Sequence, residues 1–300
     1  MRITVLLVCS MLGACSGDIG RSTDAGTTPP RDASRPLDAP ATPVDAGDVA
    51  DATAPDAAAI DAGTTPDAGP RVGCEGSTAL FCEDFESFTG GSATSPRWAQ
   101  DLGNGTLAVD SAHARGARAL HVHTMSNGRA FLRIPFAPPG NSHFGRMFLW
   151  VTQFPTAPDW AHYTLVELTG TGSSARVRPV GGQYVPPRSG AFWGIGSDGD
   201  ATGDWTDWRT SAPSVSGRWV CVEWEMDASR NFIRLTLDGV ADDALTVDTT
   251  RHGGNPVDFV FPTFDNIKIG WQLYQGGTTP PEFDLWIDDL VLDTTRIGCD

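Results

Sequence analysis

The chain has 300 residues and a formal net charge of −16, from 37 acidic and 21 basic side chains. This balance excludes a nucleic-acid partner of the usual kind, which would need a basic stripe. The charge itself indicates no substrate, because acidic side chains also keep a protein soluble.

The first fifteen residues have the pattern of an export signal. MRITVLLVCSMLGAC combines one arginine, an apolar run and small residues before Cys15, and the run is too short to span a bilayer as a mature helix. Leu12 to Cys15 resembles the lipobox of bacterial lipoproteins, whose cysteine is acylated and becomes the new N-terminus. We therefore expect a signal peptide over residues 1–14 and a lipid on Cys15. The alternative is a plain signal peptide with an incidental cysteine.

Residues 15–73 are rich in Ala, Asp, Pro and Thr and have almost no large apolar side chain. Such a segment cannot bury enough surface to offset its ordering entropy, so we expect a disordered, acidic tether. Ser16 follows the lipobox cysteine directly, whereas an aspartate there would resemble the inner-membrane retention signal. We therefore expect a lipoprotein of the outer membrane or cell surface, held to the membrane through Cys15.

Four cysteines remain for the folded part once Cys9 leaves with the signal and Cys15 carries lipid. Disulfides persist in exported proteins, and four cysteines allow three pairings. In the pairing that we favour, Cys74 and Cys82 close a short loop, while Cys221 and Cys299 tie a central strand to the C-terminus.

Residues 74–300 predict one all-β domain, an antiparallel sandwich. Short alternating runs such as FLRIPF, YTLVEL and NIKIGW recur between Gly, Pro and Asp clusters, and no helical period is sustained. RWVCVEWEMDASRNFIRLTLDG predicts a hairpin whose turn spans residues 227–231 and which ends at the tight turn Asp238-Gly239.

Adjacent aspartates interrupt the last apolar run, LWIDDLVL. Because successive strand side chains point to opposite faces, Asp288 and Asp289 should lie on opposite faces, and at least one should point at something other than bulk water. The alternative is an edge strand whose charge prevents aggregation.

Several segments together resemble a concanavalin A-like jelly-roll family. They are EDFES, GARALHV, the hairpin WVCVEWEMD…IRLTLDG, IGWQLYQG and WIDDLVLDTTRIGC. The family contains the core of a fungal secreted protein induced with cellulases, and that core is similar to glucuronan lyases. The resemblance covers residues 82–299 and implies a jelly roll of the concanavalin A-like lectin/glucanase type. It also implies a Cys221–Cys299 pair.

The resemblance further implies a structural calcium ion where the first strand, a turn before the second strand and the last strand meet. By position, Glu86 and Asp289 would supply carboxylates, and the HARGAR turn would supply main-chain carbonyls near Arg115 and Arg118. Calcium prefers such a set of oxygen ligands. The alternative is a carboxylate pair that merely caps strands.

Candidate sugar-binding residues follow from the aromatic and polar side chains that line glycan grooves. They are Trp160, His162, Arg176, Arg178, Gln183, Tyr184, Trp193, Asp200, Trp205, Trp208, Gln272 and Tyr274. Most tryptophans of a sandwich belong to its core, so each has a structural alternative. The cluster GAFWGIGSDGDATGDWTDW reads as a long loop, and loops expose their aromatic rings.

A lyase needs a group that neutralises the sugar carboxylate and a base near C5. Arg178 and Gln183 are candidates for the first role, and His162 or Tyr274 for the second. By position, His162, Arg178 and Asp200 match polar residues that line the family's cleft. One departure weakens catalysis more than binding, because Gln272 stands where related alginate lyases carry the catalytic tyrosine. A histidine beside a tyrosine also has a purely structural interpretation.

Other catalytic patterns are absent or weak. Glu223 and Glu225 share a strand face, for which a solvated outer face is the simpler interpretation. HExxH, GxSxG and P-loop motifs do not occur. We therefore expect a monomeric domain that binds an acidic or plant-type polysaccharide and has kinship with polysaccharide lyases. The alternative is an adhesive, protein-binding module of the laminin-G-like type without a sugar groove.

Overall fold

The structure is a computed structural model. It describes residues 73–156, 160–173, 175–199, 203–204, 206–207, 209–248, 260–274 and 280–300, with the backbone alone for residue 204. The expected signal peptide, tether and lipidated Cys15 lie outside these residues. Within them, no helix is long and apolar enough to cross a membrane.

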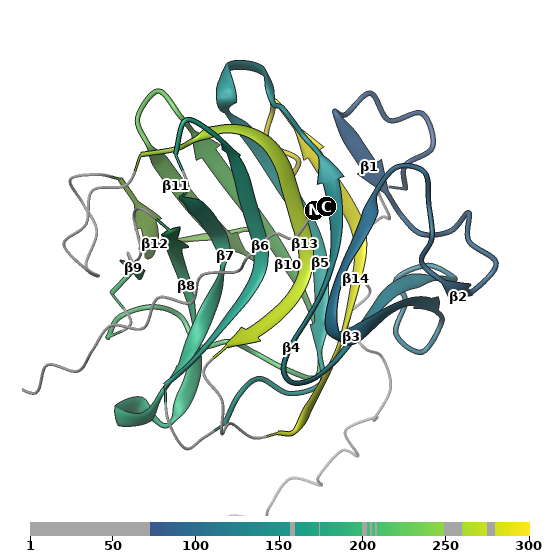
Figure 1. Cartoon of the computed structure of the whole chain (residues 1–300), viewed down its shortest axis with the longest axis horizontal. Coiled ribbons are helices and arrows are strands. Elements are labelled where there is room, and N and C mark those ends of the chain that lie inside the picture. Colours follow the sequence, from purple (N-terminus) through teal and green to yellow (C-terminus); the bar gives the residue numbers. More distant parts are fainter. Residues whose placement is uncertain are drawn as a thin grey trace, which may run out of the picture. The chain divides into compact units, whose positions relative to one another are not determined.

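Nearly all regular structure in the described part of the chain is β-strand (Figure 1). The strands are β1 (Phe81–Glu83), β2 (Gly91–Ser92), β3 (Ala99–Asp110), β4 (Ala119–Pro135), β5 (His143–Val151), β6 (Ala161–Thr171), β7 (Arg176–Val185), β8 (Gly190–Asp198), β9 (Gly203–Asp204), β10 (Trp219–Asp227), β11 (Phe232–Leu237), β12 (Val240–Val247), β13 (Thr263–Tyr274) and β14 (Glu282–Asp293). Two short 3-10 turns, η1 (Pro139–Asn141) and η2 (Pro186–Arg188), stand between described strands.

The main path of antiparallel pairing runs β12-β11-β10-β5-β14-β4-β13-β6-β7-β8-β9. Off this path, β1 pairs with β14, β3 pairs with β4, and β2 pairs with β3. The two ends of this order face each other, since β11 and β10 contact β7, and β12 contacts β8. The sheet therefore folds over on itself into a sandwich, and the predicted all-β antiparallel fold is confirmed.

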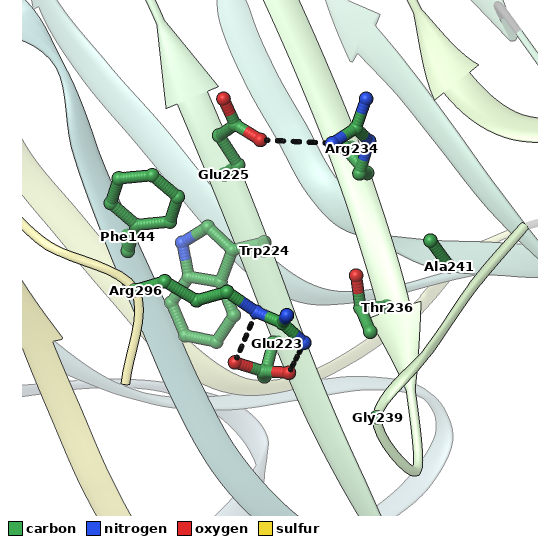
Figure 2. A pocket seen from close by; sticks show the side chains of 9 residues that line it. All are labelled: Phe144, Glu223, Trp224, Glu225, Arg234, Thr236, Gly239, Ala241 and Arg296. Carbon is green, nitrogen blue, oxygen red and sulfur yellow. Dashed lines mark hydrogen bonds and ion pairs between the residues drawn. The ribbon is translucent and has the colours of Figure 1, made fainter. Parts of the chain in front are cut away.

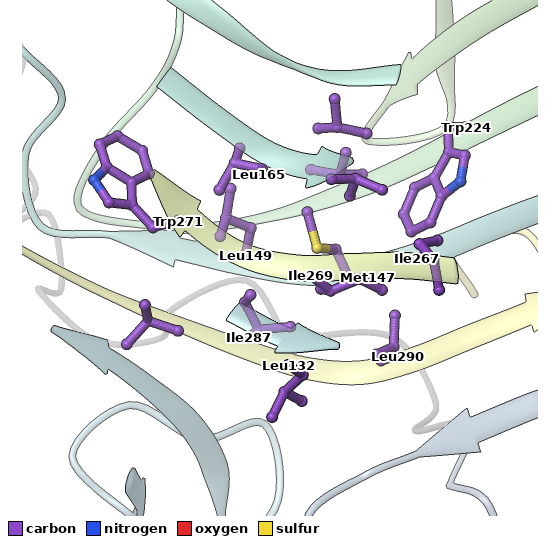
Figure 3. Close-up of a cluster of buried hydrophobic side chains, with 14 of the residues drawn as sticks. Leu132, Met147, Leu149, Leu165, Trp224, Ile267, Ile269, Trp271, Ile287 and Leu290 are labelled. Atoms are coloured by element: carbon purple, nitrogen blue, oxygen red, sulfur yellow. The ribbon is translucent and has the colours of Figure 1, made fainter. Parts of the chain in front are cut away.

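The core lies between the two halves of the sheet (Figure 3). Alternate residues of the central strands point into it, as a period of two requires. On β13 these are Ile267, Ile269, Trp271 and Leu273, all fully buried. The even-numbered residues between them point to the outer face, so one strand contributes both to the core and to a polar surface.

The predicted hairpin is present. β10 and β11 pair from Val222 with Leu237 to Asp227 with Phe232. The turn between them contains Asn231 at φ 46°, and the next turn has Asp238 at φ 50° and Gly239 at φ 77°. Asn, Asp and Gly are the residues that tolerate positive φ, so the local sequence and the turns agree.

The last strand differs from the expectation at both aspartates. β14 lies between β5 and β4, so the edge-strand interpretation is wrong. The pairing with β5 shifts between Asp288 and Val291, and Asp289 has φ 48°. This bulge breaks the strict alternation, so the expected placement of the two carboxylates on opposite faces is also wrong: both contact Arg115.

Candidate functional site

A row of side chains crosses three strands on the outer face of the β13-β6-β7 part of the sheet. Tyr274 pairs with His162, and His162 pairs with Gln183. The rings of His162 and Tyr274 are stacked, with centroids 5.4 Å apart and planes 9° from parallel. Both are half-buried, whereas Gln183 is buried. The structure thus brings together three of the predicted site residues, which are far apart in sequence.

Arg178 lies beside this row and is 5% exposed. Its Nη1 donates to the Tyr274 hydroxyl, its Nη2 donates to the Ser197 carbonyl at 3.4 Å, and its Nε lies 3.3 Å from Oδ2 of Asp198. Asp198 also lies 3.9 Å from Nη2 of Arg176. The guanidinium of Arg178 is therefore held by protein groups and holds the Tyr274 hydroxyl in place.

The other sugar-site candidates divide into three groups. Trp193 and Tyr184 are buried in the core cluster, so their structural interpretation holds. Trp160, Arg176 and Gln272 are at least partly exposed. Asp200, Trp205 and Trp208 lie outside the described residues.

Sequence reasoning missed a charge network farther along the same face. The Lys268 ammonium lies 3.0 Å from a carboxylate oxygen of Asp101 and 3.0 Å from one of Glu167. Glu167 is 2% exposed, so its carboxylate depends on this cation. The available signal was that Lys268 is the chain's single lysine, but only the fold brings β3, β6 and β13 together.

The expected calcium residues meet on the outer face of β14, around the turn between β3 and β4. Arg115 Nε donates to Asp289 Oδ2 at 2.9 Å, and the two side chains are only 3% and 4% exposed. The Arg115 guanidinium also lies over the ring of Phe148, 3.3 Å from its centroid. The Asp289 carboxylate, which was expected to bind calcium, is therefore already paired with the Arg115 guanidinium.

The neighbouring carboxylates of Glu86 and Asp288 accept hydrogen bonds from backbone amides. Glu86 accepts the Ala117 amide at 2.8 Å, and Asp288 accepts the amides of Arg115 and Asp289, each at 2.8 Å. Burial raises the pKa of Asp288 to about 7. Arg118 has no ion pair or hydrogen bond among the described residues. Because protein groups already engage these carboxylate oxygens, the donor set does not fit the expected calcium ion, whose binding itself is untested.

The glutamates of β10 lie in a charged hollow of about 100 Å³ (Figure 2). Glu223 is 4% exposed and binds Arg296 at 2.7 Å and the Gly298 amide at 2.8 Å. Glu225 lies 3.6 Å from Arg234. The simpler interpretation, a solvated outer face, is therefore wrong for Glu223, which is buried. Glu223 fastens the C-terminal segment to the sheet.

Both predicted disulfides are present. Cys74 pairs with Cys82, and Cys221 pairs with Cys299. The second bridge lies beside Glu223 and holds the same C-terminal segment. The three possible pairings are thereby reduced to the one that the sequence favoured.

No family model and no curated protein matches the chain. Among solved structures, it is similar to the cellulose induced protein Cip1, with 18% identity and a TM-score of 0.56. That match covers 73% of this chain and 100% of Cip1. A β-1,3-glucanase from Mycobacterium marinum has 10% identity and a TM-score of 0.47, with 72% of this chain and 99% of the glucanase covered. The Cip1 similarity shows the fold, so the described domain is a jelly-roll sandwich of the predicted class.

Proposed function

We propose that the folded domain binds a polysaccharide across the outer face of β13, β6 and β7. The observation that carries this proposal is the row formed by Tyr274, His162 and Gln183, with Arg178 beside it. Aromatic rings pack against the apolar faces of sugars, while amide and imidazole groups reach their hydroxyls. Because the row runs across neighbouring strands, it presents these groups side by side on one face of the sheet.

Binding is favoured over catalysis by the position of Arg178. A lyase must neutralise the sugar carboxylate, but this guanidinium is already in contact with Asp198, Ser197 and Tyr274. Gln272 also stands where related alginate lyases carry a tyrosine. Both observations argue against catalytic turnover. Neither argues against sugar binding by the half-buried rings of His162 and Tyr274.

Cleavage by β-elimination is the second candidate function. It rests on the Tyr274 hydroxyl, which Arg178 orients, and on His162 stacked beside it. One of these groups would remove the proton beside the carboxylate, and the other would protonate the leaving oxygen.

A glycan array with the full chain tests the first proposal, and two variants separate the two functions. Tyr274→Ala removes the ring, so we expect a loss of affinity of roughly two- to tenfold, because ring packing contributes roughly 0.5–1.5 kcal/mol. Tyr274→Phe keeps the ring, so it should still bind. Loss of unsaturated-uronate absorbance in Tyr274→Phe, with binding retained, would support β-elimination.

A chain that binds no glycan on the array would contradict both functions and favour the laminin-G-like alternative. Arg209→Gln is the matched surface control. Its side chain is 65% exposed and pairs with Asp207 at 3.5 Å, so its affinity should equal that of the wild type.

We further propose that the domain is displayed on the cell surface. The lipobox-like Cys15 would carry the lipid, and the segment up to residue 73 would hold the domain away from the membrane. The length of that segment supports this, since about sixty residues of coil span roughly 40 Å.

A further inference from the structure

A second hollow lies on the outer face of the sheet, where β4 and β13 meet the segment before β3. Its volume is about 380 Å³, and its lining includes Arg97, Trp98, Arg133, Pro135 and Asn266. Arg133 and Pro135 are exposed residues of β4, and Asn266 is the facing residue of β13. The hollow is therefore built on two paired strands of the sandwich.

Arg133 offers an uncommitted positive charge to this hollow. It has no ion pair or hydrogen bond among the described residues, whereas the nearby arginines Arg97 and Arg129 are both paired. Arg97, on the same hollow, binds Glu83 and the Cys82 carbonyl, both at 2.8 Å. Arg129, four residues earlier on β4, binds Asp101 at 2.9 Å.

Asn266 adds an unpaired acceptor at the same place. The residue is 6% exposed, and its side-chain Oδ1 is buried without a hydrogen-bond partner in the described part of the structure. A buried acceptor left unpaired costs free energy of folding. A ligand that brings a hydroxyl to Oδ1 would recover that cost on binding.

The hollow and the proposed sugar site lie on one face of one strand. Asn266, Lys268, Gln272 and Tyr274 all point outward from β13, since Ile267, Ile269, Trp271 and Leu273 between them face the core. Arg133 is directly opposite Lys268. The nine residues from Asn266 to Tyr274 span roughly 26 Å, which is long enough for several sugar rings in a chain.

We propose that this hollow, formed by Arg133 and Asn266, is a second subsite that binds an acidic sugar unit of the polymer held at Tyr274. Arg133 binds the sugar carboxylate, and Asn266 Oδ1 accepts a hydrogen bond from a sugar hydroxyl. This inference rests on the proposed function and assigns the acidic selectivity to Arg133, since Arg178 is occupied within the protein.

The test measures affinity of the full chain for polygalacturonate, alginate and polyglucuronate, and for the methyl-esterified form of each. Arg133→Gln should weaken binding of the acidic polymers at least about tenfold, because a charge-assisted hydrogen bond is of that order. Its affinity for the esterified forms should be unchanged. Arg234→Gln removes the same charge from β11, where the side chain pairs with Glu225, and should bind like the wild type.

Asn266→Leu is the second variant, because it fills the same volume without an acceptor. It should weaken binding of the acidic and the esterified polymers alike, and melting temperature shows whether it folds. If the wild type binds an acidic polymer and Arg133→Gln binds it equally well, the subsite is overturned while the proposed function stands. If the wild type binds none of the six polymers and no glycan on the array, both are overturned.

Discussion

Arg115 and Asp289 form a buried ion pair, 2.9 Å long, between the turn that precedes β4 and the bulge of β14. The turn and the last strand are 174 residues apart in sequence, and this pair joins them where the family resemblance implied calcium. The Arg146 guanidinium supports the same bulge by donating to the Asp289 carbonyl at 3.2 Å. The positive charge beside Asp289 is thus supplied by arginine side chains of the protein itself.

We predict that melting temperature is indifferent to added calcium and to chelator, because Arg115 already neutralises Asp289. Arg115→Ala should lower the free energy of unfolding by about 3–5 kcal/mol, since it leaves a buried carboxylate without its partner. Arg118→Ala, in the same turn, is the control and should have little effect. A melting temperature that rises with calcium in the wild type would restore Glu86 and Asp289 as ligands.

A pH dependence follows from Asp288, which is 1% exposed. Burial raises its pKa from the ordinary 3.8 to about 7. The folded state therefore holds the proton more tightly than the unfolded state, and the associated stability is present below pH 4 and lost as pH rises to about 7. Over this window the loss is at most on the order of 4 kcal/mol.

Asp288→Asn should remove this dependence of the unfolding free energy on pH. Unfolding in denaturant at several pH values checks this prediction. His143 contributes in the opposite direction, because burial lowers its pKa to about 3 and acid then favours unfolding. His143 is present in both proteins, so the difference between wild type and variant isolates Asp288. Parallel stability curves for the two proteins from pH 4 to pH 8 would contradict the prediction.

The pattern of short strands was sufficient to predict an antiparallel sandwich, and the family resemblance implied its jelly-roll type and supported the Cys221–Cys299 pair. Sequence reasoning also placed His162, Gln183 and Tyr274 at one site. It did not show the bulge at Asp289, since alternation of apolar residues cannot signal an inserted residue in advance. Arg115 and Lys268 were missed as ion-pair partners because their carboxylates come from distant strands.

The two disulfides should differ in their contribution to stability. Cys221–Cys299 closes a separation of 78 residues, and Cys74–Cys82 closes one of 8. The chain-entropy model predicts about 4 kcal/mol for the long loop and about 2–3 kcal/mol for the short one. Paired Cys→Ser variants of each bridge, compared by denaturant unfolding, test this order. An equal loss in both would show that loop length does not govern these bridges.

Membrane attachment should depend on Cys15 alone among the N-terminal cysteines. Cys15→Ser removes the thiol that would be acylated, so the protein should leave the membrane fraction and still melt like the wild type. Cys9→Ser is the matched control, because Cys9 belongs to the expected signal peptide, and it should remain attached. Membrane retention of Cys15→Ser would show that a lipid on this residue is not the anchor.

Gly145 on β5 is expected to be intolerant of any side chain, because it lies directly opposite Trp224 of β10. A Cβ at this position would overlap the Trp224 ring. That ring is 1% exposed, and its Nε1 donates to Nε2 of the buried His143 at 3.1 Å, so it cannot move aside without losing this bond.

Gly145→Ala should therefore cost roughly 1–3 kcal/mol of unfolding free energy, the usual range for overpacking a dense core. Trp224→Leu is also destabilising by itself, since it leaves a cavity and an unpaired His143 nitrogen. In the Trp224→Leu background, however, the alanine at residue 145 meets no ring and should cost much less. A double-mutant cycle by denaturant unfolding measures this coupling. Additive losses would mean that the Trp224 ring is not what keeps residue 145 a glycine.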